Sequence, residues 1–311
     1  MIENLNESVF ASLESLIKDK YQTYRLKSVD NKKTSKRAGT NTSFVKGRGM
    51  EFSDVRQYQP GDEVRTVDWR LAARTGKVYT KVFSEEKDRY VWFLIDLRAQ
   101  MKFGTKQAFK SVIAAHLVGM LAWYFNEQKD KVGGIVLADD DMLVFRPSRI
   151  RRRIMSFFNV ISENTRQKHY YENLQENISL ANACLKLRRV CRNGNVIFVL
   201  SDFSDFDEDV KKALASLAKT NEVNLINIYD VLEGRCPSPN VYLVSDGKKH
   251  VILDTRQKDI HDTYVHHFFK RLLMLRDFAL KYQIKYIPVS SDMNYYDAVA
   301  KVVSKKRKHN R

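Results

Sequence analysis

Residues 47–100 read GRGMEFSDVRQYQPGDEVRTVDWRLAARTGKVYTKVFSEEKDRYVWFLIDLRAQ, and this stretch decides the fold. Its longer first part alternates acidic and basic side chains around aromatic ones. Its end, from Val91 to Ile95, is an unbroken apolar run that stops at Asp96. A short apolar run that ends at a carboxylate is typical of a buried parallel strand, which brings a polar group to the carboxyl edge of its sheet. The stretch therefore predicts a charged module followed by a parallel sheet.

The rest of the chain alternates strand and helix. Strands are predicted at 78–83, 91–95, 132–137, 142–145, 196–200, 223–229 and 284–289, with a hairpin at 241–254. Helices are predicted at 5–20, 106–128, 149–163, 178–191, 258–282 and 294–304, and a further one is capped by Ser204 or Asp205. Residues 28–43 are polar without periodicity and predict a linker. This order predicts an α/β fold with a doubly wound, mostly parallel sheet and helices on both faces.

Four carboxylates follow predicted strands, namely Asp96, Asp202, Asp230 and Asp292. In doubly wound sheets, ligands bind beyond the carboxyl ends of the strands, where the strand order reverses. These side chains are therefore expected on one rim of the sheet, although they lie far apart in the sequence.

Composition indicates a globular protein of 311 residues, with 43% hydrophobic and 29% charged residues. No apolar run approaches the roughly 20 residues that span a membrane. The N-terminus is amphipathic and acidic, unlike a signal or transit peptide. Three cysteines without a CxxC pair fit a reducing compartment. We therefore expect a cytoplasmic protein.

The net charge of +17 invites a nucleic-acid interpretation, but much of it lies at the ends of the chain. Residues 1–48 carry ten Lys and Arg against five Asp and Glu, and residues 301–311 carry six Lys and Arg and no acid. The basic tail is interpreted first as a solvated terminus, with a phosphate or acidic-partner contact as the alternative.

The charged module carries a family resemblance. The run Gly49 to Tyr58, then Pro60-Gly61-Asp62, residues 65–69 and Ala73-Arg74 resemble the pattern G-x-EF-x-x-(L/V)R-x-Y-x-x-GD-x-x-R-x-(I/V)DW-x-x-x-AR. This is the signature of the "domain of unknown function 58" family. Phe93 to Asp96 and Val199 to Phe203 look like the first and fourth strands of that family's von Willebrand factor A-like domain. The resemblance covers residues 40 to 300, and the chain is similar to the short members that lack N-terminal membrane helices.

The resemblance implies a domain order and a partner. It implies an N-terminal helix and basic linker over 1–43, a small β-rich signature module over 44–88, a von Willebrand A-like domain over 89–304, and a basic tail over 305–311. Family members are generally encoded beside MoxR-type AAA+ ATPases and are thought to help them to assemble or activate other proteins. The expected function is therefore that of an adaptor beside such an ATPase.

Von Willebrand A domains often hold a divalent cation with D-x-S-x-S, a threonine of a second loop and an aspartate of the fourth strand, an oxygen set that suits Mg²⁺. By resemblance, the positions of this site are taken here by Asp96, Arg98, Gln100, Ile178 (with Ser179 one residue out of register) and Asp202. The carboxylates remain and the hydroxyl ligands are lost. We expect a degenerate site without a cofactor, in which Arg98 supplies positive charge to Asp96 or Asp202. The alternative is an Mg²⁺ site completed by Asp230 or by a partner's carboxylate.

The signature module is rich in paired charges. Its members are Glu51, Phe52, Arg56, Tyr58, Gly61, Asp62, Arg65, Asp68, Trp69 and Arg74. We favour a buried or half-buried ion-pair scaffold, with a docking surface as the alternative. The chain has no P-loop, GxGxxG, HExxH or GxSxG motif, so the sequence predicts a protein that is not an enzyme.

A second function class stays open because of an internal basic cluster, Arg146, Arg149, Arg151, Arg152 and Arg153. With the basic termini, this cluster would serve a nucleic-acid-binding protein whose affinity falls steeply with salt. It also begins a helix, where positive charge is unfavourable for the helix dipole. A solvated face is the structural alternative.

Overall fold

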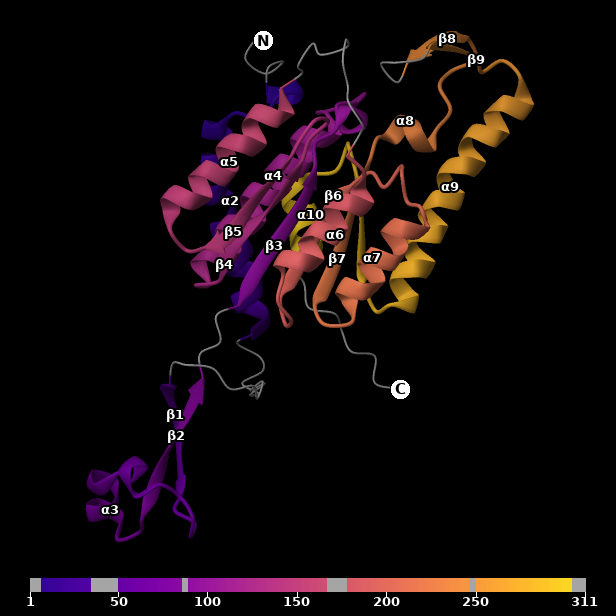
Figure 1. Ribbon diagram of the computed structural model, residues 1–311. Helices are drawn as coiled ribbons and strands as arrows, with labels where there is room; N and C mark the ends of the chain where they lie inside the picture. The colour runs from indigo at the N-terminus through magenta and orange to yellow at the C-terminus, as the bar shows by residue number, and fades with distance from the viewer. Residues whose placement is uncertain (1–6, 35–49, 86–88, 167–177, 246–249, 304–311) are drawn as a thin grey trace. The chain divides into compact units, whose positions relative to one another are not determined.

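The computed structural model describes residues 7–34, 50–85, 89–166, 178–245 and 250–303. The chain forms two compact units (Figure 1). The sheet unit comprises Met1–Lys36 and Arg89–Arg311, and the signature unit comprises Arg37–Asp88.

The sheet unit is built on a six-stranded sheet with the order β10-β7-β6-β3-β4-β5. Its strands are β3 (Tyr90–Asp96), β4 (Lys131–Leu137), β5 (Met142–Ser148), β6 (Val196–Ser201), β7 (Glu222–Tyr229) and β10 (Lys285–Ser290). Every neighbouring pair is parallel except β4 and β5. The predicted strands and their mostly parallel arrangement are therefore confirmed.

Two apolar cores cover the two faces of this sheet. One core contains side chains of α2 (Leu13–Thr34), α4 (Lys110–Glu127), α5 (Arg151–Thr165) and α10 (Tyr295–Val303). The other contains side chains of α6 (Leu180–Val190), α7 (Glu208–Ala218) and α9 (Lys258–Lys281). The two helix layers can be followed in Figure 1. Because helices cover both faces, the central strands are continuously apolar, as the sequence pattern predicts.

Two adjacent glycines let the strands approach closely at β4. A Cβ atom on Gly134 would lie 2.2 Å from the carbonyl oxygen of Phe93 on β3. A Cβ atom on Gly133 would lie 2.4 Å from the carbonyl oxygen of Phe145 on β5. Strand glycines commonly mark such close backbone approach or a bulge, and the pairing of β4 with β5 does shift in register between Val132 and Gly134.

The N-terminal helix differs from its predicted range. The expected helix at 5–20 instead runs from Leu13 to Thr34, so the predicted linker at 28–43 begins too early. The later start follows from Ser12, whose hydroxyl accepts a hydrogen bond from the Ser15 amide at 3.0 Å in the manner of an N-cap. The later end is possible with few apolar residues because a formed helix gains one backbone hydrogen bond for each residue added.

Helix α2 is fixed to α4 by polar contacts inside the apolar interface. The Trp123 indole donates to the carbonyl of Leu16 at 3.0 Å, and His116 Nδ1 lies 2.9 Å from Asp19 Oδ2. The sheet unit therefore includes this N-terminal helix.

Between β7 and α9 the chain forms α8 (Val231–Gly234) and the predicted hairpin, β8 (Val241–Ser245) with β9 (His250–Asp254). The predicted turn at Asp246-Gly247 lies outside the described residues. None of the helices in the described part of the chain has the length and apolarity needed to cross a bilayer.

The signature unit is an antiparallel ribbon of β1 (Met50–Gln57) and β2 (Tyr79–Glu85), with a 3₁₀ turn at Val64–Thr66 and α3 (Trp69–Thr75) between them. Asp68 caps α3 by accepting from the amides of Arg70 and Leu71, and Gly76 ends it at φ 70°. An aspartate and a glycine at this spacing are helix start and stop signals. Sequence reasoning passed over them and over β1.

Candidate functional site

The candidate site lies at the switch point of the main sheet. β3 and β6 are neighbours, but the chain continues from β3 toward β4 and from β6 toward β7 on the opposite side. Such a reversal opens a crevice beyond the carboxyl ends of the two strands. It brings together Asp96, which is 0% exposed, and Asp202, which is 2% exposed.

Arg98 saturates the Asp96 carboxylate. Its Nε donates to Oδ1 at 2.9 Å, and its Nη2 donates to Oδ2 at 2.7 Å. The Arg98 amide also donates to Oδ1, and the Ser201 hydroxyl donates to Oδ2 at 2.7 Å. A two-pronged contact of this kind matches the planar guanidinium to the carboxylate.

The second carboxylate that pairs with Arg98 belongs to Asp205, whereas the sequence suggested Asp96 or Asp202 as the partner of Arg98. Arg98 Nη1 lies 2.8 Å from Asp205 Oδ2, and Nη2 lies 3.2 Å from Oδ1. The Leu180 amide donates to Asp205 as well. Because Asp205 is engaged here, the cap of α7 predicted at Ser204 or Asp205 falls instead to Asp207, which accepts from the Val210 amide at 2.8 Å.

Asp202 pairs with Lys110, a residue that sequence reasoning missed. Lys110 is the first residue of α4, and its Nζ lies 2.7 Å from Asp202 Oδ2 and 2.9 Å from Glu233 Oε1. Glu233 in turn lies 2.6 Å from Arg271 Nη2 on α9. A lone lysine at the start of an otherwise apolar helix was the available signal, because a buried lysine needs a carboxylate partner.

Asp230 is also committed to structure. Its carboxylate accepts from the amide and hydroxyl of Thr105, from the Ser291 hydroxyl at 2.7 Å, and from the Leu232 amide at 2.8 Å. Asp230 also forms the capping box of α8 with Glu233. The interpretation of Asp230 as a spare metal ligand therefore finds no support in its contacts.

Burial and ion pairing shift the pKa values of the acids of the rim in opposite directions. Burial raises the pKa of the Asp96 carboxyl, and the Arg98 guanidinium opposes this rise. Burial acts likewise on Asp205, but there the hydrogen bonds and charge of Arg98 prevail and lower the pKa. Burial raises the pKa of the nearby Cys184 thiol to about 12, which keeps it protonated and unreactive at neutral pH.

The residues at this rim do not fit a divalent cation. Both oxygens of Asp96 face the N–H groups of Arg98, and Asp202 faces the Lys110 ammonium. Ile178 contributes only its carbonyl, which accepts from Arg98, and Ser179 instead caps α6 by accepting from the Asn182 amide. Gln100 lies half-buried in the 3₁₀ turn that follows Arg98. Within the described ranges, no three His, Cys, Asp or Glu side chains form a group that could hold a metal ion.

The ion pairs of the signature unit join exposed cations to half-buried acids, so the predicted scaffold is half-buried at most, with no buried charge in residues 55–81. Arg56 and Asp62 pair at 2.6 Å, and Lys81 and Asp68 pair at 3.6 Å, in both cases with a solvent-exposed cation. Over residues 55–81, only Val67 and Thr80 are buried. The unit is a small two-stranded ribbon, and an alternating charge pattern on a ribbon of this size has no core to enter.

The other signature residues take distinct places. Arg65, Trp69 and Arg74 are exposed. The exposed fraction is 64% for Trp69 and 61% for Val64. Tyr58 is half-buried, and Gly61 sits at φ 108° in the turn that positions Asp62. Glu51 and Phe52 lie in β1, and their side chains are outside the described part of the chain.

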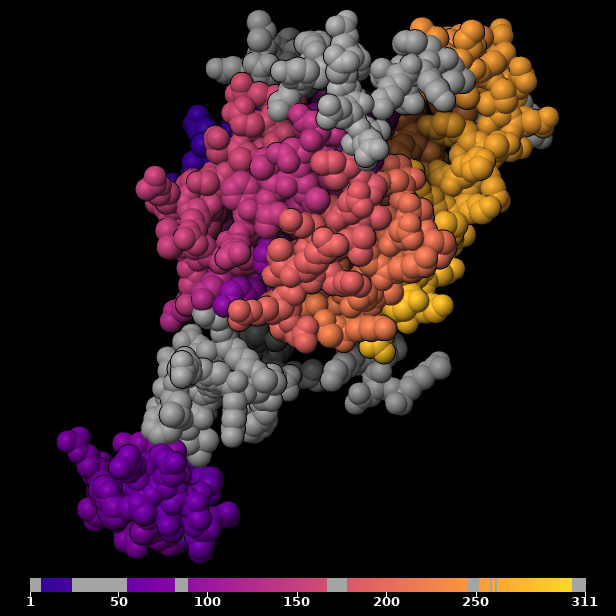
Figure 2. Space-filling model, viewed as in Figure 1, coloured from indigo at the N-terminus to yellow at the C-terminus, as the bar shows by residue number. Residues whose placement is uncertain are grey.

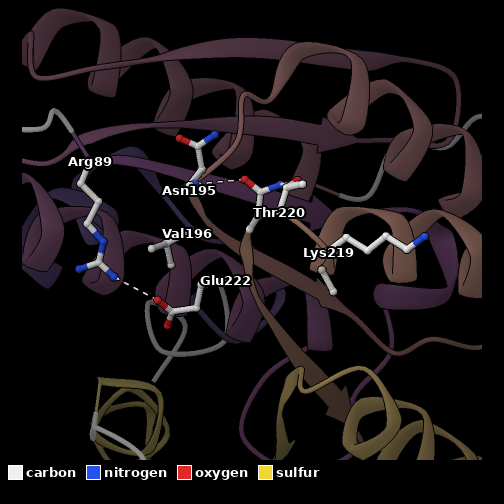
Figure 3. A pocket seen from close by; sticks show the side chains of 9 residues that line it. Arg89, Asn195, Val196, Lys219, Thr220 and Glu222 are labelled. Carbon is white, nitrogen blue, oxygen red and sulfur yellow. Dashed lines mark hydrogen bonds and ion pairs between the residues drawn. The ribbon is translucent and has the colours of Figure 1, made fainter. Parts of the chain in front are cut away.

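A cavity of about 340 Å³ lies at the opposite, amino-terminal ends of β3, β6 and β7 (Figure 3). It is lined by Arg89, Asn195, Thr220 and Glu222, among others, and Arg89 pairs with Glu222 across it at 3.4 Å. None of the rim residues lines this cavity.

Comparison with known proteins gives a family match and distant relatives. The family model described as "Protein of unknown function DUF58" matches residues 54–271. Uncharacterized proteins of Mycobacterium bovis and of Mycobacterium tuberculosis are 23% identical over 215 residues, or 69% of this chain. The chain spans 66% of the length of these curated relatives.

The solved structures that match are more distant. The VWA domain of SpRpn10 aligns with a TM-score of 0.37 and 12% identity over 68% of this chain and 94% of that one. The PilB minor pilin from Streptococcus sanguinis aligns with a TM-score of 0.34 and 8% identity over 73% of this chain and 62% of that one. These scores are below the level that establishes a shared fold.

Proposed function

The chain belongs to the DUF58 family, and from this premise we propose that it is a non-enzymatic interaction protein that works beside a MoxR-type AAA+ ATPase in the assembly or activation of other proteins. The family resemblance supplies the class of partner. The surface of the signature unit supplies the place where that partner binds.

The observation that carries the proposal is the exposure of two large apolar side chains, Trp69 and Val64, in one stretch of the signature unit. Arg65, Arg70 and Arg74 of the same stretch are exposed as well. Tryptophan and arginine are enriched among the residues that dominate binding energy at protein interfaces. A solvent-exposed tryptophan contributes little to the stability of its own unit. Its burial by a partner would instead contribute to the free energy of binding.

The switch-point rim supports a role without a cofactor. Arg98 and Lys110 neutralise Asp96 and Asp202 from within the chain, at the position where the resemblance implies a metal. We propose that the rim acts as a rigid base for the surrounding loops. Its charged side chains meet partners within the chain, so we assign it no part in substrate activation.

The test is a pull-down of a MoxR-type AAA+ ATPase by the full chain, with wild type, Trp69→Ala and Phe269→Ala compared. Phe269 is a matched control because it is an aromatic residue on α9 that is 50% exposed. We expect Trp69→Ala to weaken retention of the ATPase by at least about tenfold, which corresponds to a hot-spot contact. Phe269→Ala should retain it as the wild type does. Equal retention by all three proteins would contradict the proposal.

Two further arms address the cofactor and the alternative function. Retention is measured with and without Mg²⁺, for the wild type and for Arg98→Ser. Retention by the wild type in both conditions supports the cofactor-free rim, and a requirement for Mg²⁺ contradicts it. Recovery of nuclease-sensitive material alone would favour a nucleic-acid-binding protein.

A further inference from the structure

Four arginines give one edge of the main sheet a positive charge that no nearby acid in the sequence offsets. β5 is the edge strand and, among the described strands, pairs only with β4. Arg146 lies on β5, and Arg151, Arg152 and Arg153 form the first turn of α5, directly after it. All four are exposed, and no Asp or Glu occurs from Met142 to Ser162. β5 and these four residues are called the arginine edge, which lies in the magenta part of the surface in Figure 2.

The four arginines have no ion-pair partner among the residues that the structure describes. Arg149, which lies between them in the sequence, is not counted because its charge acts on Asp130. The unit itself therefore leaves four positive charges without a structural use.

These arginines work against the helix that carries them. α5 has Ile150 at its N-cap, with no side-chain hydrogen bond to the free amides, and no acidic residue in its first turn. Positive charge at this end opposes the helix dipole, and an apolar N-cap leaves amides without a side-chain acceptor. A local sequence that gives up helix stability in two ways is typical of a surface kept for binding.

A cavity of about 210 Å³ adjoins the edge strand. Val144, Phe145 and Phe157 give it an apolar lining, and Arg146 and Arg153 line it too. An apolar cavity of about 150 Å³ can hold benzene, so this one has room for a single apolar side chain.

We propose that the arginine edge binds an extended acidic segment of a partner protein, which adds to β5 as a further strand. From Met142 to Arg146, before Pro147 removes a donor, the free edge supplies backbone N–H and C=O groups to the segment. The arginines meet its carboxylates, and the cavity takes one apolar side chain. An open strand edge favours a peptide over a nucleic acid, because only a peptide can continue the backbone ladder. This surface is separate from the signature unit, so the proposal does not depend on the ATPase.

The test uses fluorescence anisotropy of the full chain with a labelled peptide of about ten residues that alternates Glu and Val. The variant R151Q/R152Q/R153Q removes three charges from the arginine edge. We expect its affinity for the peptide to fall about tenfold, because three exposed ion pairs are lost. The matched control, R188Q/R189Q/R192Q, removes three exposed arginines on and after α6 and should bind within about twofold of the wild type.

Two more probes separate strand addition from charge attraction. A peptide of the same length and charge, with proline in place of each valine, cannot pair with β5 and should bind at least about tenfold more weakly. Backbone amides of residues 142–146 that face away from β4 should exchange hydrogen more slowly when the Glu-Val peptide is bound. Both readouts involve the wild-type chain, so they do not depend on the folding of a variant.

Three results would overturn the proposal. The first is an equal loss of affinity in both triple variants, which would indicate net charge alone. The second is equal binding of the proline peptide or unchanged exchange at β5. The third is tighter binding of a single-stranded oligonucleotide of about twenty nucleotides that displaces the peptide, which would assign the edge to nucleic acid.

Discussion

At the scale of single residues, Arg98 is the position on which the rim depends. It holds a fully buried carboxylate, Asp96, with two hydrogen bonds and reaches a second carboxylate, Asp205. Replacing Arg98 with Ser leaves Asp96 buried without its cation. We expect a loss of about 3–5 kcal/mol in the free energy of unfolding, measured in urea, because an uncompensated buried charge is strongly destabilising.

The double variant Asp96→Asn with Arg98→Ser is the control for this loss. It removes both charges, so it should be more stable than Arg98→Ser alone. An unfolding midpoint for Arg98→Ser equal to that of the wild type would show that the pair does not stabilise the fold.

The loss in Arg98→Ser should also depend on pH. Burial already raises the pKa of Asp96, and removal of Arg98 takes away the group that opposes the rise. A carboxyl whose pKa is higher in the folded state stabilises the fold below its unfolded pKa of about 3.9 and loses this effect as pH rises through the folded value. The stability difference between variant and wild type should therefore shrink from about pH 8 to about pH 5. A difference that is constant or grows on acidification would contradict this assignment.

At the scale of elements, α5 begins with an N-cap that the sequence could improve. Ile150 is 58% exposed, so replacing it removes little buried apolar area. Ile150→Asp supplies an acceptor for the free amides and a negative charge at the positive end of the helix. We expect the free energy of unfolding to increase by about 1 kcal/mol in urea titrations. Ile150→Ala, which supplies neither group, should show no such gain.

A substitution in β4 should lower the stability of the fold. Gly134→Ala would place a methyl group against the backbone of β3, where the strand cannot move without breaking its ladder. We expect a loss of about 3 kcal/mol or more in thermal or urea unfolding. Gly194→Ala is the comparison, because a Cβ atom there meets no atom within 4 Å and only the φ of 81° is strained. It should cost clearly less than Gly134→Ala.

At the scale of the whole molecule, the two units differ in how much they bury. The sheet unit has two extended apolar cores, whereas residues 55–81 of the signature unit bury only Val67 and Thr80. An isolated ribbon of this kind is marginally stable in water. We expect amides of 50–85 to exchange hydrogen much faster than those of β3 and β6 in the free protein, and to gain protection when the ATPase is bound. Equal protection in the free protein would contradict this picture.

The sequence pattern was enough to predict the strands of the main sheet, and the reason is physical. A strand buried on both faces must be apolar throughout, so the apolar runs of β3 and β6 identify them as buried strands. The pairing of Arg98 with Asp96 was equally accessible, because two residues of separation keep them close. Which of Asp202 and Asp205 pairs with Arg98 could not be predicted, because it depends on the ion pair between Asp202 and Lys110 of α4. The exposure of the cations in the signature unit could not be predicted either, since a sequence of alternating charges is the same for a surface and for a buried network.

The charges of Arg98 and Lys110 are bonded covalently to the chain, unlike a metal ion. Such a counter-charge cannot dissociate, cannot be stripped by a chelator, and is present as soon as the polypeptide folds. On the proposal that the rim holds no cation, its counter-charges need no supply of metal from the cell, and a change in free-cation concentration would leave the rim unaltered.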